Sequence, residues 1–481
     1  MKMLFSSTIF LFLFLPIVIG LYYFAKEEYR NCLLLVASII FYAYGEPKLV
    51  FLLLVSVLFN YIISIGIDKA DGNIKVKKGL LVFAILVNIG ALFVCKYLNF
   101  TIEIVEKLLG DILEHIPVAL PLGISFYTFQ IISYLVDVYR KDIKVQKNII
   151  NFALYVTFFP QLVTGPIVRY KTMAQDLENR KESFDDVCAG IRRFLVGFCK
   201  KVILANNLGI IAEYAFRIDN YGNLPVVTAW VGAISYTLQI YFDFAGYSDM
   251  ALGLGRIFGF HFEENFNYPY AAKSFTDFWR RWHISLSSWF RDYIYIPLGG
   301  SRVSKGRLIF NLLVVWTVTG IWHGAAWNFV VWGVLYFVCL VIEKNLIHPE
   351  RMKSKLLIQG YRIITLLGVN FLWVFFNARA EYGMSAVRRG AGYCLSMVGL
   401  NDNPFFAQEI MFYFQQYGWF LFFGILAATP LAVKLKAVFA KKRIANAIWE
   451  VAASVSLAVC FLYSVANLVM GSHNPFIYFN F

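Results

Sequence analysis

Two of the six histidines in this chain lie in strongly apolar, aromatic sequence, and they are the side chains best placed to do chemistry. His323 lies in Thr319-Gly-Ile-Trp-His-Gly324, and His283 ends the motif Phe278-Trp-Arg-Arg-Trp-His283. An imidazole in such surroundings acts as a general acid or base, or passes protons along a relay. The alternative for each is a structural histidine, hydrogen-bonded to a backbone carbonyl or a carboxylate.

The glycines beside His323 favour a functional role. Gly320 and Gly324 have no side chain, so a substrate or a second backbone can approach closely at these positions. We expect a pocket near this histidine.

Further side chains are candidates for substrate contacts. Arg280, Arg281 and Arg291 would bind either lipid headgroups or an anionic acyl donor. Asp243 lies in an apolar stretch with hydroxyl groups nearby, so helix-to-helix hydrogen bonding is its simpler explanation. The full set of substrate-binding candidates is Trp282, Arg280, Arg291, Trp322, Trp327 and Asp243. No metal ligands are expected, because the cysteines are scattered and no zinc motif is present.

The composition places these residues in a membrane protein. The chain is 59% hydrophobic and 15% charged, whereas soluble domains are roughly 25% charged. Apolar blocks such as 5–24, 49–67, 79–94 and 447–466 are close to the roughly 20 residues that cross a bilayer as a helix. Because these runs do not alternate with period two, they predict an all-α polytopic fold and exclude a barrel.

The distribution of charge predicts the topology. Basic side chains concentrate in 68–78, 140–147 and 434–445, so these loops are expected in the cytoplasm. We therefore attribute the net charge of +14 to basic loops that lie against the anionic headgroups of the membrane. Nucleic acid is not an expected partner, since base-reading motifs are absent. Crossings are expected near 3–24, 32–44, 49–67, 79–97, 118–138, 194–214, 225–244, 358–376, 418–433 and 446–466, with both termini extracytoplasmic.

Two apolar stretches have basic residues on both flanks and do not fit as simple crossings. The first, 152–168, contains Pro160 and Gly165-Pro166, which predicts a broken hairpin that enters and leaves at one face. The second, 308–341, is interrupted at 319–324, which predicts two helical segments that meet at His323. Non-helical backbone at membrane depth must be buried in protein or line a cavity.

The region 255–307 is predicted to be cytoplasmic, interfacial and amphipathic. Ser274 followed by Asp277 is typical of a helix start, and Pro297-Leu-Gly-Gly300 of a helix end. The spacing predicts one helix of about five turns between them, with His283 on its buried aromatic face. Simple membrane anchoring by aromatic side chains is the alternative for most of this helix.

These motifs resemble the membrane-bound O-acyltransferase family, and within it the bacterial branch that acetylates alginate. The resemblance rests chiefly on Phe278–Gly300 and Gly320–Trp327. Further matches, which spread it over most of the chain, are Pro121–Gln130, Phe159–Pro166, Tyr241–Gly253 and Asn474–Phe479.

The resemblance implies a fold and a mechanism. It implies one integral-membrane acyltransferase domain over 1–481, with 308–341 as a broken-helix catalytic segment. The expected fold is a ring of about 10–12 transmembrane helices with re-entrant segments around a central funnel or tunnel. His323 would be the catalytic base, and His283 would orient the donor or the catalytic imidazole.

The resemblance also implies the partners. The expected donor is acetyl-CoA, with no resident cofactor, and the expected acceptor is an exported polysaccharide. An extracytoplasmic partner protein would receive the acetyl group first. The expected location is the plasma membrane of a bacterium.

Two alternatives remain. One is D-alanyl transfer from a carrier protein toward teichoic acid, although the chain length and the signatures Pro297–Gly300 and Asn474–Phe479 favour acetylation. The other is a proton-linked transporter or a polysaccharide export component. No internal inverted repeat is visible in the sequence to support transport.

Overall fold

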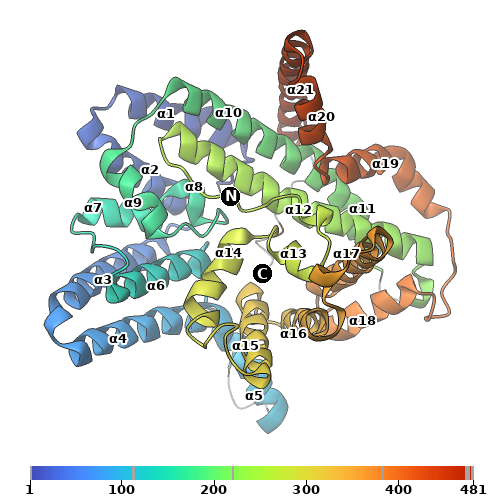
Figure 1. Cartoon of the computed structure of the whole chain (residues 1–481), viewed down its shortest axis with the longest axis horizontal. Coiled ribbons are helices and arrows are strands. Elements are labelled where there is room, and N and C mark those ends of the chain that lie inside the picture. Colours follow the sequence, from blue (N-terminus) through green and yellow to red (C-terminus); the bar gives the residue numbers. More distant parts are fainter. Residues whose placement is uncertain (1–2, 111–113, 219–220, 382, 472–476, 478–481) are drawn as a thin grey trace. The chain divides into compact units, whose positions relative to one another are not determined.

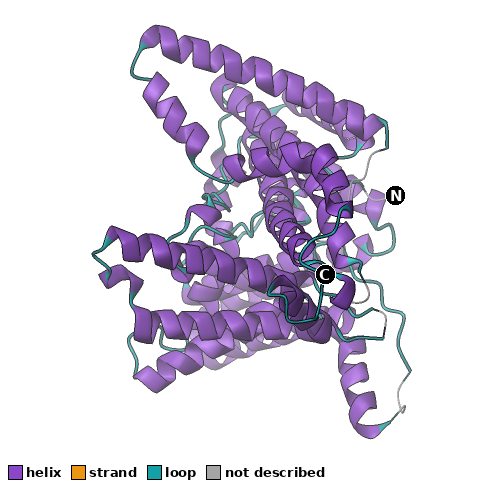
Figure 2. Ribbon diagram, turned by 90° about the vertical axis from the view of Figure 1, so that its right-hand side faces the viewer, coloured by secondary structure: helices purple, strands orange, loops and turns teal. Residues whose placement is uncertain are grey.

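The computed structural model describes residues 3–110, 114–218, 221–381, 383–471 and 477. Across these residues the regular elements are helices (Figure 2). In addition, one isolated β-bridge pairs Glu381 with Met384. The predicted all-α class is confirmed.

The order of the helices along the chain can be followed in Figure 1. The first are α1 (Leu15–Phe24), α2 (Glu27–Gly45), α3 (Val50–Lys69), α4 (Ile74–Leu92), α5 (Leu98–Leu109), α6 (Ile124–Arg140), α7 (Ile149–Thr157), α8 (Phe159–Leu162), α9 (Tyr170–Asn179), α10 (Phe184–Cys199) and α11 (Asn206–Phe216). The rest are α12 (Val226–Ile257), α13 (Phe275–Trp279), α14 (Ile284–Phe290), α15 (Lys305–His323), α16 (Trp327–Ile342), α17 (Lys355–Asn377), α18 (Ala386–Met397), α19 (Glu409–Ala427), α20 (Leu431–Phe439) and α21 (Arg443–Val469). The π-helical segments Phe93–Tyr97 and Lys200–Ala205 join α4 to α5 and α10 to α11, whereas Phe10–Phe14 precedes α1, and Arg291–Tyr295 and Glu343–Ile347 extend α14 and α16.

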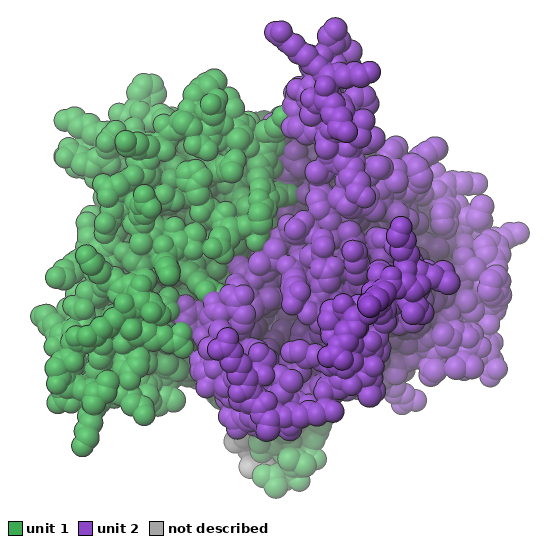
Figure 3. Space-filling model, viewed as in Figure 1, with its two compact units in different colours: residues 1–194, 247–264 green, residues 195–246, 265–481 purple. Residues whose placement is uncertain are grey.

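The chain forms two compact units (Figure 3). Unit 1 comprises Met1–Phe194 and Tyr247–Glu264, and unit 2 comprises Leu195–Gly246 and Asn265–Phe481. The chain passes from one unit to the other within α10, within α12 and again between Glu264 and Asn265. Both histidines of interest belong to unit 2, whose aromatic core is built mainly from α12, α13, α15, α16 and α17.

Seven helical stretches among the described residues are long and apolar enough to cross a membrane. They are Val50–Gly72, Ile74–Leu109, Phe184–Phe216, Trp327–Arg351, Lys355–Asn377, Glu409–Ala427 and Arg443–Val469. Trp327–Arg351 covers the second half of the segment predicted to be broken, and the other stretches overlap predicted crossings. The remaining predicted crossings coincide with α1, α2, α6 and α12.

The crossing predicted from residue 118 begins later, at Ile124. Gly123, just before α6, has a φ of 72°, a left-handed conformation that glycine adopts without strain. A Cβ at this position would lie 2.2 Å from the carbonyl oxygen of Leu162 in α8. The helix therefore starts where the chain must pass closely against α8.

The stretch 152–168 is broken as predicted. Helix α7 ends at Thr157, and α8 occupies only Phe159–Leu162 before the chain becomes irregular. Phe158 and Phe159 are fully buried. That this segment enters and leaves at one membrane face stays a prediction.

The break at His323 is also confirmed. Helix α15 ends at His323, and α16 begins at Trp327 and packs against it. A Cβ on Gly320 would lie 2.4 Å from the carbonyl oxygen of Phe329, and one on Gly333 would lie 2.4 Å from that of Trp316. Gly320 therefore serves the approach of a second backbone, one of the two roles expected for it.

The prediction of a single helix between Ser274 and Pro297 is wrong. Ser274 caps the start as expected, because its Oγ accepts from Asp277 N, but α13 ends at Trp279 and α14 begins only at Ile284. His283 has a φ of 43°, which interrupts any right-handed helix. The backbone N–H of Ile284 instead donates to the carbonyl oxygen of Asn265. A tertiary contact overrides the local helical pattern.

Candidate active site

A buried carboxylate fixes the start of α13. Glu343, 2% exposed, accepts hydrogen bonds from the backbone N–H groups of Phe275 (2.7 Å) and Thr276 (2.9 Å). It also accepts one from the hydroxyl of Tyr361 (2.9 Å). The segment that carries His283 is thereby tied to the end of α16 and to α17.

His283 is fully buried and held by Asn265. The Nδ1 of His283 lies 3.1 Å from Oδ1 of Asn265. The same oxygen accepts from the backbone N–H (3.2 Å) and the hydroxyl (2.9 Å) of Ser285. Because an amide oxygen only accepts, His283 donates from Nδ1, and its lone pair is on Nε2. The ring also packs edge-on against Phe244, with centroids 4.6 Å apart.

His283 is neutral at physiological pH. It lies outside the seven candidate spans, and its burial lowers its pKa from 6.5 to about 3. Loss of hydration penalises the charged imidazolium, which accounts for the direction of this shift. His283 is thus suited to hold or orient another group by hydrogen bonding.

His323 lies at the end of α15 in an aromatic enclosure. Its ring centroid is 5.1 Å from each of the rings of Trp322, Trp332 and Phe376. The side chain is buried, at 6% exposure. The surrounding rings restrict its orientation and exclude most water, as a general base in a protected reaction requires.

Trp322 connects the two histidines. Its ring centroid lies 6.1 Å from that of His283 and 5.1 Å from that of His323. The predicted residues His283, Trp322 and His323 therefore come together in one cluster, although His283 and His323 belong to different segments of the chain.

A cavity of about 500 Å³, here called the Arg280 cavity, adjoins this cluster. Its lining includes three basic residues, Arg280, Arg291 and Lys344. It also includes the rings of Trp279 and Trp316 and the hydroxyl-bearing side chain of Thr319. Thr319 lies one turn before His323 on α15. The cavity thus combines cationic groups with aromatic side chains, and through Thr319 it comes within one helical turn of His323.

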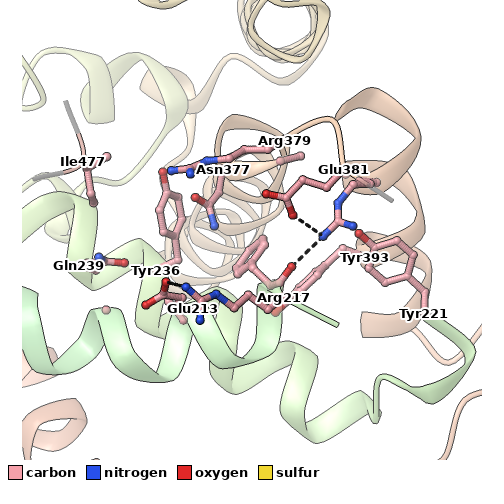
Figure 4. Close-up of a pocket in the computed structure, with 16 residues that line it drawn as sticks. Glu213, Arg217, Tyr221, Tyr236, Gln239, Asn377, Arg379, Glu381, Tyr393 and Ile477 are labelled. Atoms are coloured by element: carbon pink, nitrogen blue, oxygen red, sulfur yellow. Dashed lines mark hydrogen bonds and ion pairs between the residues drawn. The ribbon is translucent and has the colours of Figure 1, made fainter. Parts of the chain in front are cut away.

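A second cavity, of about 340 Å³, is called the Arg379 cavity (Figure 4). Its polar lining residues include Glu213, Arg217, Tyr221, Tyr236, Gln239, Asn377, Arg379, Glu381, Arg389 and Tyr393. Asn377 directly follows Phe376, whose ring contacts His323. This cavity was not anticipated from the sequence.

The two cavities lie toward opposite ends of α16. Near the start of α16, Asn328 donates to the carbonyl oxygen of Phe375 (3.2 Å), at the end of α17. Just beyond the other end, Glu343 accepts from Tyr361, near the start of α17. Leu340 and Lys344 of the Arg280 cavity belong to that second end, whereas the Arg379 cavity is lined by residues that end α17. His323 lies nearer the first of these ends, where its ring contacts Trp332 in the second turn of α16 and Phe376 near the end of α17.

The other predicted residues occupy different positions. Trp282 is buried in the hydrophobic core, where its ring stacks on that of Phe278 with the two centroids 5.6 Å apart. Trp327 is 49% exposed at the start of α16. Asp243 forms a buried ion pair with Lys201 (2.7 Å) and accepts from the backbone N–H of Ile477 (2.9 Å). The environment of Asp243 matches its simpler, structural explanation.

Three residues that the sequence reasoning missed shape the site. Asn265 precedes His283 by 18 residues, and no local pattern connects them. Glu343 is a single acidic residue at the end of an apolar run, and Arg379 follows another such run. A charge directly after a long apolar helix was the available signal for both.

Comparisons with known proteins agree on one relationship. Residues 36–384 match a family model described as the membrane-bound O-acyltransferase family. A probable alginate O-acetylase from Pseudomonas putida is 38% identical over the whole of both chains. Another, from Pseudomonas aeruginosa, is 43% identical over 78% of this chain and 72% of its own length. A peptidoglycan O-acetyltransferase from Helicobacter pylori is 34% identical over 83% of this chain and 80% of its own.

Proposed function

This chain belongs to the membrane-bound O-acyltransferase family, and we propose that it transfers an acetyl group from acetyl-CoA to a hydroxyl that serves an exported polysaccharide. The relatives named as acetylases of alginate and of peptidoglycan support acetyl as the group and a polysaccharide as its destination. The observation that carries the proposal is the buried position of His323 close to both cavities: Thr319, one turn earlier on α15, lines the Arg280 cavity, and Asn377, next to its contact Phe376, lines the Arg379 cavity.

The mechanism assigns one role to each cavity. The thioester carbonyl is delivered from the Arg280 cavity, and the acceptor hydroxyl comes from the Arg379 cavity. His323 takes the hydroxyl proton as the oxygen attacks the carbonyl carbon, a contribution typically worth roughly 10²–10⁴-fold. The carbon–sulfur bond then breaks, and the departing sulfur receives the proton from His323. An ester and a free thiol result, with the imidazole neutral again.

His283 is the positioning residue in this scheme. Asn265 fixes its Nδ1–H, so its Nε2 lone pair points in one direction. A neutral imidazole held in this way orients the donor or the ring of His323 through the cluster around Trp322.

The Arg280 cavity suits a phosphate-bearing thioester. Guanidinium groups bind phosphate in a planar fork, and the Trp279 and Trp316 rings accept an apolar arm. Among the described residues, no ion pair occupies the guanidinium of Arg280. We assign it to the phosphates of coenzyme A.

Replacing Arg280 by glutamine is expected to raise the KM for acetyl-CoA by about 3–10-fold, with little change in kcat, because an exposed charge-assisted contact is lost. Initial rates of thiol release at several ionic strengths measure this effect. Arg351→Gln is the matched control, since Arg351 is exposed and does not line the cavity. An equal rise in KM in both variants would remove Arg280 from the donor site.

The orientation in the membrane follows from the basic loops. These loops, the Arg280 cavity and the donor are assigned to the cytoplasm of a bacterium, and both termini to the opposite side. The Arg379 cavity then opens toward an extracytoplasmic partner protein that passes the acetyl group to the polymer. The chain is assigned to the inner membrane.

The test is whether acetyl esters or D-alanyl esters on the exported polymer are formed only when the chain is present. Exported polymer from cells that lack the chain is compared with polymer from cells that carry it, and base-released acetate and D-alanine are both measured. Acetate is expected to depend on the chain. Dependence of D-alanine alone would favour transfer from a carrier protein, and no change in either ester would contradict acyl transfer.

A further inference from the structure

A buried carboxylate ties together two segments that line the Arg280 cavity. Glu343 begins the π-helical segment that extends α16. One of its oxygens accepts from the backbone N–H of Phe275 (2.7 Å) and from the hydroxyl of Tyr361 (2.9 Å). The other oxygen accepts from the backbone N–H of Thr276 (2.9 Å). Both oxygens are therefore used to fix the start of α13 to the end of α16.

Each of the two tied segments brings one cation to the cavity. Arg280 directly follows α13 and Lys344 directly follows Glu343, and both side chains line the cavity. Neither has an ion pair or a hydrogen bond among the residues that the structure describes. The third cation of the lining, Arg291, is already paired with Asp292 (2.6 Å).

The two cations are close enough for their charges to interact. The charge of Arg280 acts on the ammonium group of Lys344, and like charges that are held together raise the free energy of the folded chain. An anion bound between them reverses the sign of this contribution. Two positive charges suit a phosphate or a diphosphate better than one carboxylate, since the guanidinium binds phosphate oxygens in a planar fork and the ammonium adds a point charge.

We propose that Arg280 and Lys344 form a two-cation site for the phosphates of the acyl donor, and that Glu343 is the positioning residue that keeps them together. Lys344 is thus a second donor-binding residue, whereas Glu343 acts on the donor only through the two cations. This inference rests on the proposed function and specifies how its donor is held.

Replacing Lys344 by glutamine should weaken the binding of coenzyme A by about 3–10-fold, because one exposed contact between charges is lost. Isothermal titration of the full-length chain in detergent measures this affinity without any chemistry. Lys353→Gln is the matched control, since Lys353 is exposed and does not line the cavity. Equal affinity of wild type and Lys344→Gln for coenzyme A would remove Lys344 from the site.

A donor without phosphates tests which part of coenzyme A the cations bind. S-acetylpantetheine has the same thioester arm but lacks the phosphates and the nucleoside. Wild type and Lys344→Gln should use it with the same kcat/KM, whereas their values for acetyl-CoA should differ. An equal loss with both donors would contradict a phosphate site.

Replacing Glu343 by glutamine separates positioning from simple charge. The variant loses a negative charge near two cations, so electrostatics alone would strengthen the binding of coenzyme A. An amide nitrogen, however, cannot accept from a backbone N–H. The tie to α13 is then broken, and we expect the binding of coenzyme A to weaken by about 10-fold as both cations lose their positions. Unchanged or tighter binding by the folded variant would refute the positioning role.

A double-mutant cycle with a milder variant tests whether Glu343 acts through the cations. Glu343→Asp keeps the charge and both oxygens but shortens their reach by one methylene. Arg280→Gln should weaken binding less in the Glu343→Asp protein than in wild type, because the guanidinium is already displaced. Fully additive effects would show that Glu343 does not act through Arg280. Glu350→Gln should bind coenzyme A as wild type does, since Glu350 is exposed and does not line the cavity.

A lipid phosphate is the other anion that could occupy this site. Phosphatidylglycerol added to a neutral detergent is titrated against the same variants. Binding of this lipid that depends on Lys344, with an affinity for coenzyme A that does not, would overturn the assignment to the donor.

The proposed function is tested separately from this inference. A chain that binds coenzyme A through Lys344 but forms no acetyl ester would contradict only the function. Ester formation combined with an affinity for coenzyme A that ignores both Lys344 and Glu343 would contradict only the inference.

Discussion

Replacing His323 by glutamine is expected to lower acetyl transfer by about 10²–10⁴-fold, the usual contribution of a general base. Glutamine keeps a polar group of similar reach but cannot take a proton. The rings of Trp322, Trp332 and Phe376 enclose this position, so the variant side chain stays confined where the imidazole was. Measurement of thiol release and ester formation by equal amounts of membrane-inserted protein gives the ratio.

A second histidine variant controls for this experiment. His348 is partly exposed just after the π-helical segment Glu343–Ile347, and its Nδ1 lies 3.3 Å from Glu350. His348→Gln should transfer acetyl groups at the wild-type rate. Full activity of His323→Gln would leave proton-linked transport as the better account of this cluster.

Replacing His283 by glutamine is expected to lower kcat by about 10–100-fold with little change in KM, because misplacement of a reacting group by roughly 1 Å has effects of this size. Asn265→Ala should give a similar but smaller loss, since it keeps the imidazole and removes the oxygen that orients it. Steady-state kinetics on both variants measure these effects. A purely structural role would instead lower the yield of folded protein and leave kcat intact.

The pH dependence of stability gives an independent measurement of His283. Its pKa is about 3 in the folded chain and 6.5 ordinarily. Between these values the unfolded chain binds a proton that the folded chain does not, so the free energy of unfolding falls as the pH drops from 6.5 toward 3. His283→Gln should lose this part of the dependence. Unfolding midpoints in detergent across pH 4–7 check it, and parallel curves for both proteins would contradict the assignment.

The elements around His323 were predictable from the sequence because their causes are local. An apolar run interrupted by Gly320 and Gly324 predicts two helices and a break, and the structure has α15 and α16. The all-helical class follows equally from unbroken apolar runs. Each of these features depends on residues that are close in the chain.

The arrangement at His283 was not predictable because it depends on a residue that is distant in the sequence. The aromatic spacing of 274–297 satisfies a continuous helix, but Asn265 binds Ile284 and Ser285 and holds His283 at a positive φ. The Arg379 cavity was missed for the same reason. Its lining comes from α11, α12, α17 and α18, which no sequence period relates.

The contact between α15 and α16 limits how the site can move. Backbone touches backbone at Gly320 and Gly333, so neither helix can slide past the other without a clash. We therefore expect access to His323 to be controlled by rotation of side chains such as Phe376, whose ring is 5.1 Å from that of His323. Side-chain rotations are far faster than the microsecond-to-millisecond shifts of whole helices. Opening of the passage would therefore not limit turnover, and the chemical step or product release would set the rate.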